Sequence, residues 1–133
     1  MKRIFILLFA FFPIVNACCQ TIEEHIKNGN AKHELKDYRG AITDYSKAIQ
    51  LNPKFTKAYY LRGVAKAEMQ DYNGAIADFS KIIELNPSDA DAYFARGIAK
   101  IRLKQNEGGC IDLHTAGNLG NDKAFAQIKK YCE

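Results

Sequence analysis

The sequence predicts an all-α protein built from helix-turn-helix units that stack on one another. Three glycines, Gly29, Gly63 and Gly97, are spaced by 34 residues. An Asp-x-x-Gly-Ala motif recurs at the same spacing from Asp37 and from Asp71, and an Asn-Pro pair follows each copy. A fixed period of this length is typical of repeated helix pairs, which present an extended surface rather than an enclosed active site.

Length and composition are those of one small globular domain. The chain has 133 residues, of which 47% are apolar and 26% are charged. This balance supports a packed core and argues against global disorder. The formal charge of +4 falls to +2 without Lys2 and Arg3, so charge gives no reason to expect a nucleic-acid partner.

Residues 1–17 are interpreted as a signal peptide. Lys2 and Arg3 form a basic start, an apolar run follows over residues 4–15, and Ala17 ends the segment with a small residue. The run is shorter than the roughly 20 apolar residues that a membrane-spanning helix needs. For a bacterial source, we therefore expect a protein that is secreted across the inner membrane, into a compartment where disulfides can form.

The end of this segment allows two kinds of processing. Residues 15–18, with the sequence Val-Asn-Ala-Cys, resemble a bacterial lipobox, and the resemblance implies that Cys18 carries a lipid and begins the mature chain. The alternative is ordinary cleavage after Ala17. Residues 18–21 would form a short tether, so a lipid on Cys18 would hold the domain close to the membrane.

The first unit covers residues 22–55. Thr21 and Glu24 fit a capping box at the start of its first helix. Apolar and small residues then recur at helical spacing, at Ile22, Ile26, Gly29, Ala31 and Leu35. Asp37 is expected to cap a second helix over residues 38–50. Pro53 ends that helix, because proline disfavours a helical residue before it.

The second unit covers residues 56–89 and repeats this plan, with a first helix over residues 56–69 and a second that starts after Asp71. The third unit covers residues 90–121 and opens with a capping box from Ser88 to Asp91. Its pattern then weakens, because Gly109 stands in place of alanine and Asn121 in place of proline.

The last segment, residues 122–133, is expected to form a single helix. A stack of helix pairs leaves one apolar face open at its end, and a closing helix is the usual way to cover that face. The full prediction is therefore seven helices, with three pairs and one cap helix.

The units resemble tetratricopeptide repeats, which carry aromatic, glycine, alanine and proline residues at fixed places. The second unit matches best, with Tyr59, Gly63, Ala75, Phe79, Ile82 and Pro87. The first unit departs at His25, which stands at an aromatic place, and the third departs at three places. The resemblance covers nearly all of the chain after the leader, and it implies a right-handed α-solenoid of about three repeats with a C-terminal capping helix.

The resemblance also implies a concave groove, lined by the first helix of each unit, that accepts a peptide or a partner helix. The residues expected to line this partner-binding groove are Asn30, His33, Lys57, Tyr60, Val64, Asp91, Phe94, Ile98 and Arg102. Some family members clamp a C-terminal carboxylate with a Lys/Asn pattern. Here Ile26 replaces the first lysine, which argues against that ligand.

Charged residues repeat with the same period. Asp44, Asp78 and Asp112 lie on second helices, and the basic residues Arg62, Arg96 and Lys130 lie on first helices. We expect each aspartate to pair with the basic residue of the next unit and so to fix the register of stacking. The alternative is that Arg62 and Arg96 hold a ligand carboxylate.

Cys110 and Cys132 are predicted to form a disulfide, since they lie on consecutive antiparallel helices. A bond between them would close a loop of about 22 residues and contribute about 3 kcal/mol. Two free buried thiols are the alternative. A metal site is not expected, because no second pair of ligands accompanies Cys110 and His114.

No catalytic set, glycine-rich phosphate loop or metal motif stands out, and no cofactor is expected. The sequence therefore predicts a non-enzymatic protein-protein interaction module of the cell envelope, either periplasmic or anchored to the membrane only by a lipid on Cys18. The alternative is a structural envelope lipoprotein that self-associates, with its groove filled by the cap helix.

Overall fold

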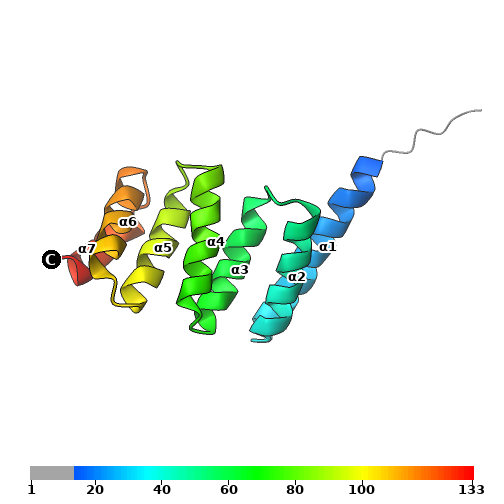
Figure 1. Ribbon diagram of the computed structural model, residues 1–133, viewed down its shortest axis with the longest axis horizontal. Helices are drawn as coiled ribbons and strands as arrows, with labels where there is room; N and C mark the ends of the chain where they lie inside the picture. Colours follow the sequence, from blue (N-terminus) through cyan, green and yellow to red (C-terminus); the bar gives the residue numbers. More distant parts are fainter. Residues whose placement is uncertain (1–13) are drawn as a thin grey trace, which may run out of the picture.

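The computed structural model describes residues 14–133, with side chains from residue 21 onward. Residues 1–13 of the predicted signal peptide lie outside the described residues. The described chain forms seven helices (Figure 1): α1 Ile14–Glu34, α2 Tyr38–Leu51, α3 Thr56–Glu68, α4 Tyr72–Leu85, α5 Ala90–Arg102, α6 Asn106–Asn118 and α7 Lys123–Tyr131. The all-α prediction, with three helix pairs and one closing helix, is confirmed.

The helices lie in one row, and each packs on the helix before and the helix after it (Figure 1). α1 lies at one end of the row and α7 at the other. Because each unit contacts mainly its neighbours, the fold is a solenoid that exposes a long surface.

The two Asp-x-x-Gly turns form as predicted. The Asp37 carboxylate accepts a hydrogen bond from the backbone N–H of Gly40 at 3.0 Å, and Asp71 accepts one from Gly74 at 2.9 Å. A Cβ atom at either glycine would collide with the capping carboxylate. Glycine at these two places therefore makes room for the N-cap interaction.

Both predicted capping boxes are wrong. Thr21 lies inside α1, which begins at Ile14 and continues through Cys18. In the third unit Asp89 is the N-cap and accepts from the backbone N–H of Ala92 at 2.9 Å. The backbone N–H of Ser88 donates to the side chain of Asn86. Because Asp89 is the N-cap, α5 begins one residue later than a cap at Ser88 would place it.

A core cluster fills each unit, and large side chains fit against small ones. The Tyr45 ring crosses Gly29, and the Phe79 ring crosses Gly63; an added Cβ would lie 2.5 and 2.7 Å from those rings. In the third unit the backbones themselves approach, since a Cβ on Gly109 would lie 2.9 Å from the carbonyl oxygen of Gly97. Gly109 is therefore required for close packing of α5 against α6.

The C-terminal helix closes the stack. Ala124 and Ile128 of α7 are buried against Leu113 and Ala116 of α6, and Phe94 packs against the same cluster. None of the described helices combines the length and apolar character needed to cross a membrane.

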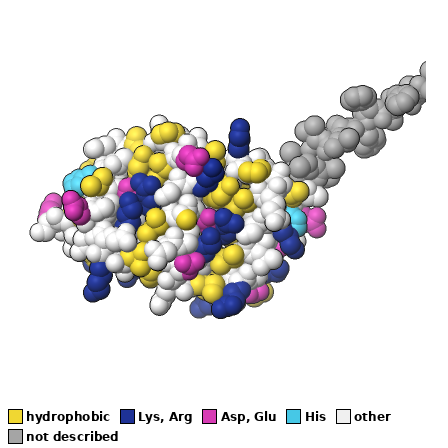
Figure 2. All heavy atoms as spheres, viewed as in Figure 1, with side chains coloured by type: hydrophobic (Ala, Val, Ile, Leu, Met, Phe, Trp, Pro, Cys, Tyr) yellow, Lys and Arg dark blue, Asp and Glu magenta, His cyan; other side chains and the backbone are white. Residues whose placement is uncertain are grey.

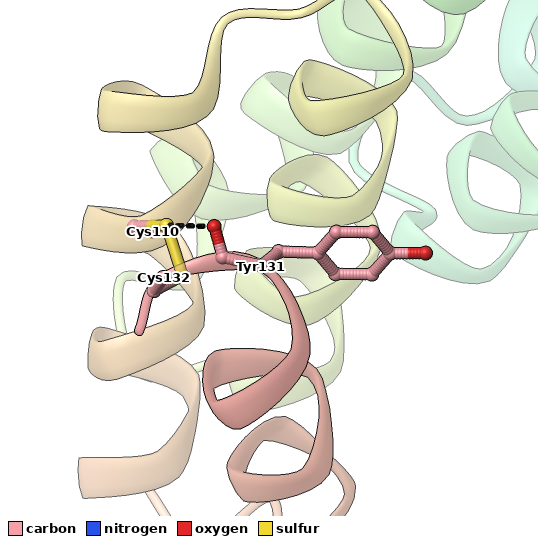
Figure 3. Close-up of a disulfide and its surroundings, with 3 residues drawn as sticks. All are labelled: Cys110, Tyr131 and Cys132. Carbon is pink, nitrogen blue, oxygen red and sulfur yellow. Dashed lines mark hydrogen bonds between the residues drawn. A yellow bond between two sulfur atoms is a disulfide. The ribbon is translucent and has the colours of Figure 1, made fainter.

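A disulfide joins Cys110 of α6 to Cys132 at the end of α7, with Cα atoms 5.8 Å apart. Figure 3 shows this bond beside the carbonyl oxygen of Tyr131, which lies 3.8 Å from Cys110 Sγ, while the Tyr131 ring points away from it. The bond ties the closing helix to the unit that it covers.

Candidate functional site

The first helices of the three pairs line one continuous face of the solenoid. Four hollows on this face share lining residues, so they form a single groove. Val64, Asn30, Lys57 and Tyr60 each belong to two of them. We call this surface the groove and the largest hollow within it the aromatic pocket.

The aromatic pocket has a volume of about 460 Å³. Its lining comes from α3, α4 and α5, and comprises Tyr60, Val64, Ala67, Glu68, Gln70, Tyr72, Phe79, Phe94, Ala95, Ile98, Ala99 and Arg102. A concave, largely apolar hollow of this size with a few polar groups at its edge is typical of a ligand-binding site.

The repeat itself positions the pocket walls. Tyr60 and Phe94 occupy equivalent places on α3 and α5, one period apart, as do Val64 and Ile98. The Phe79 ring of α4 lies 5.7 Å from the Tyr60 ring, centroid to centroid, and is tilted by 54°. Small alanine side chains on α3 and α5 leave the space between these larger groups open.

Charged groups lie at both ends of the pocket. Glu68 and Arg102 line it near the ends of α3 and α5. At the other end an adjoining hollow of about 220 Å³ contains Lys57, Asp89 and Asp91 beside Tyr60. Burial raises the pKa of the Tyr60 hydroxyl, and the negative charges of Asp91 and then Asp89 raise it further.

The first-unit half of the groove is lined by both polar and apolar side chains. Its two hollows, of about 340 and 290 Å³, are lined mainly by α1. The amide oxygen of Asn30 accepts a hydrogen bond from the Tyr45 hydroxyl at 2.8 Å. The His33 ring makes an edge contact with Tyr38 at 5.1 Å. These two side chains therefore contribute to packing as well as to the groove surface.

All nine residues predicted for the groove lie on this face. Five of them line the aromatic pocket, namely Tyr60, Val64, Phe94, Ile98 and Arg102. Lys57 and Asp91 lie in the adjoining hollow, and Asn30 and His33 lie in the first-unit half. Asp91 also accepts a hydrogen bond from the Asn121 side chain at 2.7 Å.

Sequence reasoning missed the contribution of the second helices. Tyr72 and Phe79 of α4 line the pocket, whereas all the predicted groove residues lie on first helices. The aromatic character of Phe79 was visible in the sequence. The packing of α4 against both α3 and α5, which brings this ring to the pocket, was not.

The predicted charge ladder between units is wrong. Asp78 pairs within its own unit: Arg62 donates to it through Nε and Nη2 at 2.9 and 2.6 Å, and Lys66 Nζ lies 2.9 Å away. Asp112 receives Arg96 and Lys100 in the same way, at 2.7 and 2.8 Å. Basic residues one turn apart on a first helix face the buried aspartate of the second helix that packs beside it.

The first unit has a weaker version of this cluster. Asn28 stands where the other units have arginine, so Asp44 pairs with Lys32 at 2.6 Å. The His25 ring nitrogen Nδ1 lies 3.7 Å from Asp44. At the other end of the chain, the Lys130 ammonium lies over the Tyr131 ring at 4.7 Å instead of pairing with Asp112.

The arginines do connect neighbouring units, but through serine. Arg62 Nη1 donates to Ser46 Oγ of the preceding unit at 3.0 Å, and Arg96 donates to Ser80 at 3.1 Å. Both guanidinium groups are thus engaged by protein groups, which argues against the alternative that they hold a ligand carboxylate. Among the side chains of residues 21–133, no set of three or more His, Cys, Asp or Glu groups is placed to hold a metal ion.

Comparison with known proteins identifies the repeat. A family model described as TPR repeat matches residues 29–70, and one described as tetratricopeptide repeat matches residues 56–89. A comparison with curated proteins gave no match.

Solved structures with this fold include a TPR domain of Arabidopsis OM64, at 26% identity and a TM-score of 0.81, covering 86% of this chain and 96% of that one. The TPR2B domain of yeast Sti1, in complex with pHsp70, is 25% identical with a TM-score of 0.76, over 84% and 93% of the two chains. The second TPR domain of human RPAP3, in complex with an HSP70 peptide, shares the fold at 24% identity, with a TM-score of 0.81 and coverages of 87% and 98%.

Proposed function

Because this chain belongs to the tetratricopeptide repeat family, we propose that it is a non-enzymatic interaction module that binds a peptide or a partner helix in its groove. The observation that carries this proposal is the open aromatic pocket between α3 and α5. Tyr60 is 36% exposed there, beside the partly buried Phe94. An apolar groove of this kind accepts anchoring side chains from an extended or helical segment.

The structural neighbours support peptides as the ligand class. The Sti1 and RPAP3 domains were solved with pHsp70 and with an HSP70 peptide. The RPAP3 ligand ends in Glu-Glu-Val-Asp and is acidic. In this chain Ile26 stands at the place of the first clamp lysine, so we propose a ligand other than a chaperone tail.

The alternative, a self-associating protein whose groove is filled by the cap helix, receives less support. In a self-filled groove the cap helix would occupy the pocket, whereas the pocket lining comes from α3, α4 and α5. Self-association remains the second candidate, because Ile111 and Phe125 near the C-terminal end are 61% and 58% exposed.

On the face that Figure 2 shows, basic, acidic and hydrophobic side chains are interspersed, which does not favour a nucleic-acid partner.

We also propose that the protein works outside the cytoplasm, with residues 1–17 removed as a signal peptide and Cys18 lipidated. The disulfide supports an oxidising compartment. Intact mass of the protein from its native membrane fraction tests this. An acylated chain starting at Cys18 is expected, and a Cys18 start without acyl mass would rule out lipidation.

The groove is tested by affinity capture from the envelope with wild type, Tyr60→Ala and Tyr60→Ala/Phe94→Ala. Loss of specific partners is expected because the pocket loses its aromatic walls. Ile111→Ala/Phe125→Ala is the matched control, since it shortens two apolar side chains away from the pocket. Recovery of the same partners by the Tyr60 variants, with circular dichroism confirming their fold, would refute the groove.

A further inference from the structure

The groove differs in charge from the rest of the protein. Its lining contains five acidic residues, Glu23, Glu34, Glu68, Asp89 and Asp91, against three basic ones, Lys27, Lys57 and Arg102. The groove therefore has a formal charge of −2, while the chain as a whole has +4. All other residues together, Lys2 and Arg3 included, carry +6.

The fold produces this separation. Five basic residues of the first helices, Lys32, Arg62, Lys66, Arg96 and Lys100, turn toward the buried aspartates of the second helices. These five basic residues lie outside the groove lining, and the three aspartates offset three of their five charges. Among the described side chains, Glu34, Glu68 and Asp91 of the same helices form no ion pair with the second helices, and they line the groove, where they are exposed.

The acidic groups flank the apolar part of the groove. Asp89 and Asp91 lie beside Tyr60 at one end of the aromatic pocket, and Glu68 lines its other end. Glu34 continues the line toward the first unit, where it borders the hollow that shares Val64 with the pocket. An apolar segment seated in the pocket would therefore place its flanking residues next to carboxylates.

We infer that the groove selects a segment whose apolar side chains are flanked by lysine or arginine. This inference rests on the function proposed above and specifies the chemistry of the partner. Complementary charge at the edge of an interface favours the correct partner and disfavours like-charged segments, while the apolar contacts supply most of the affinity.

Three synthetic probe peptides test the inference directly. They share a core of leucine and phenylalanine and differ only in flanking residues, which are lysine, glutamine or glutamate. Fluorescence anisotropy of the labelled peptides with the purified domain should rank lysine above glutamine above glutamate. The affinities for the lysine and glutamate peptides are expected to differ about tenfold, as for two or three exposed ion pairs. Added salt should reduce this difference in affinity, since exposed charges are screened.

Variants locate the source of the preference. Glu34→Gln/Glu68→Gln should reduce the ratio of the affinity for the lysine peptide to that for the glutamate peptide at least threefold, because both carboxylates border the groove. Glu84→Gln/Glu107→Gln makes the same change in net charge on the second helices and should leave the ratio unchanged. Neither pair includes Asp89, which caps α5, or Asp91, which bonds Asn121.

The outcomes separate this inference from the proposed function. Equal or tighter binding of the glutamate peptide, lost in Tyr60→Ala, would overturn the charge preference and leave the groove intact as a binding site. An equal decrease of this affinity ratio in both double variants would also overturn the charge preference, since the net charge of the protein rather than the groove would then determine which peptide binds. Binding of none of the peptides, or binding unaffected by Tyr60→Ala, would count against the groove itself.

Discussion

The second and third units have the same backbone plan but are held together by different chemistry. In the second unit a bulky ring fills the space that a glycine leaves, as Phe79 does over Gly63. In the third unit two glycines, Gly97 and Gly109, let the backbones of α5 and α6 approach, and a disulfide ties the closing helix to α6. A repeat can therefore lose its typical side chains and keep its geometry, provided that close backbone contact and a covalent link replace them.

The buried charge cluster provides the largest expected effect. Asp78→Ala should lower the free energy of unfolding by about 3 kcal/mol, because it leaves Arg62 and Lys66 unpaired in a largely buried site. Asp44→Ala should cost about 1 kcal/mol, since its partner Lys32 is 44% exposed and can be hydrated. Urea unfolding measures both. Equal losses would show that the first-unit cluster is as tightly built as the second.

Removal of the disulfide tests the third unit. Cys110→Ser/Cys132→Ser should cost about 3 kcal/mol, because the unfolded chain regains the freedom that the cross-link removes. Hydrogen exchange should show faster exchange in α7 first, since a nine-residue helix is not stable alone. Unchanged stability under oxidising conditions would mean that α7 is held by its apolar contacts.

Alanine substitutions at the neighbouring glycines Gly108 and Gly109 in α6 should have smaller effects on stability, and the two effects should be opposite in sign. A Cβ on Gly109 would lie 2.6 Å from Ile101 Cγ1 and 2.9 Å from a backbone oxygen, so Gly109→Ala should be destabilising by about 1 kcal/mol after the gain in helix propensity. On Gly108 the nearest atom, in the flexible Lys100 chain, is 3.6 Å away. Gly108→Ala should therefore stabilise by up to about 1 kcal/mol. Changes of the same sign in thermal unfolding would contradict the backbone contact between α5 and α6.

The smallest expected effect is the titration of Tyr60. Its pKa should lie above the usual value of 10.0, because burial and the charges of Asp91 and Asp89 disfavour the phenolate. The folded state then binds this proton more tightly than the unfolded state, so this group lowers stability as pH rises above 10 and has no effect below it. Ultraviolet difference titration against Tyr60→Phe measures the pKa, and an ordinary value would place Tyr60 outside the pocket.

The sequence predicted the helices and their period, because these follow from spacing along single helices, and the resemblance to tetratricopeptide repeats indicated the first-helix residues of the groove. It failed on the aspartate pairs. Asp78 lies 16 residues after Arg62 and 18 before Arg96, and both separations repeat with the period, so periodicity cannot distinguish them. The choice depends on which face of α4 meets α3, which only packing reveals. The role of Asn121 is hidden from the sequence for the same reason, because its side-chain amide donates to Asp91, 30 residues earlier in the chain. Its amide oxygen accepts from the backbone N–H of Lys123, two residues later.

The central claim, that the groove is the binding surface, is tested most directly by amide chemical-shift mapping with the lysine-flanked probe peptide. The largest chemical-shift changes are expected on α3 and α5, around Tyr60, Val64, Phe94 and Ile98, and Tyr60→Ala should abolish them. Changes concentrated on the outer surfaces of α2, α4 and α6, or around Ile111 and Phe125, would contradict the claim.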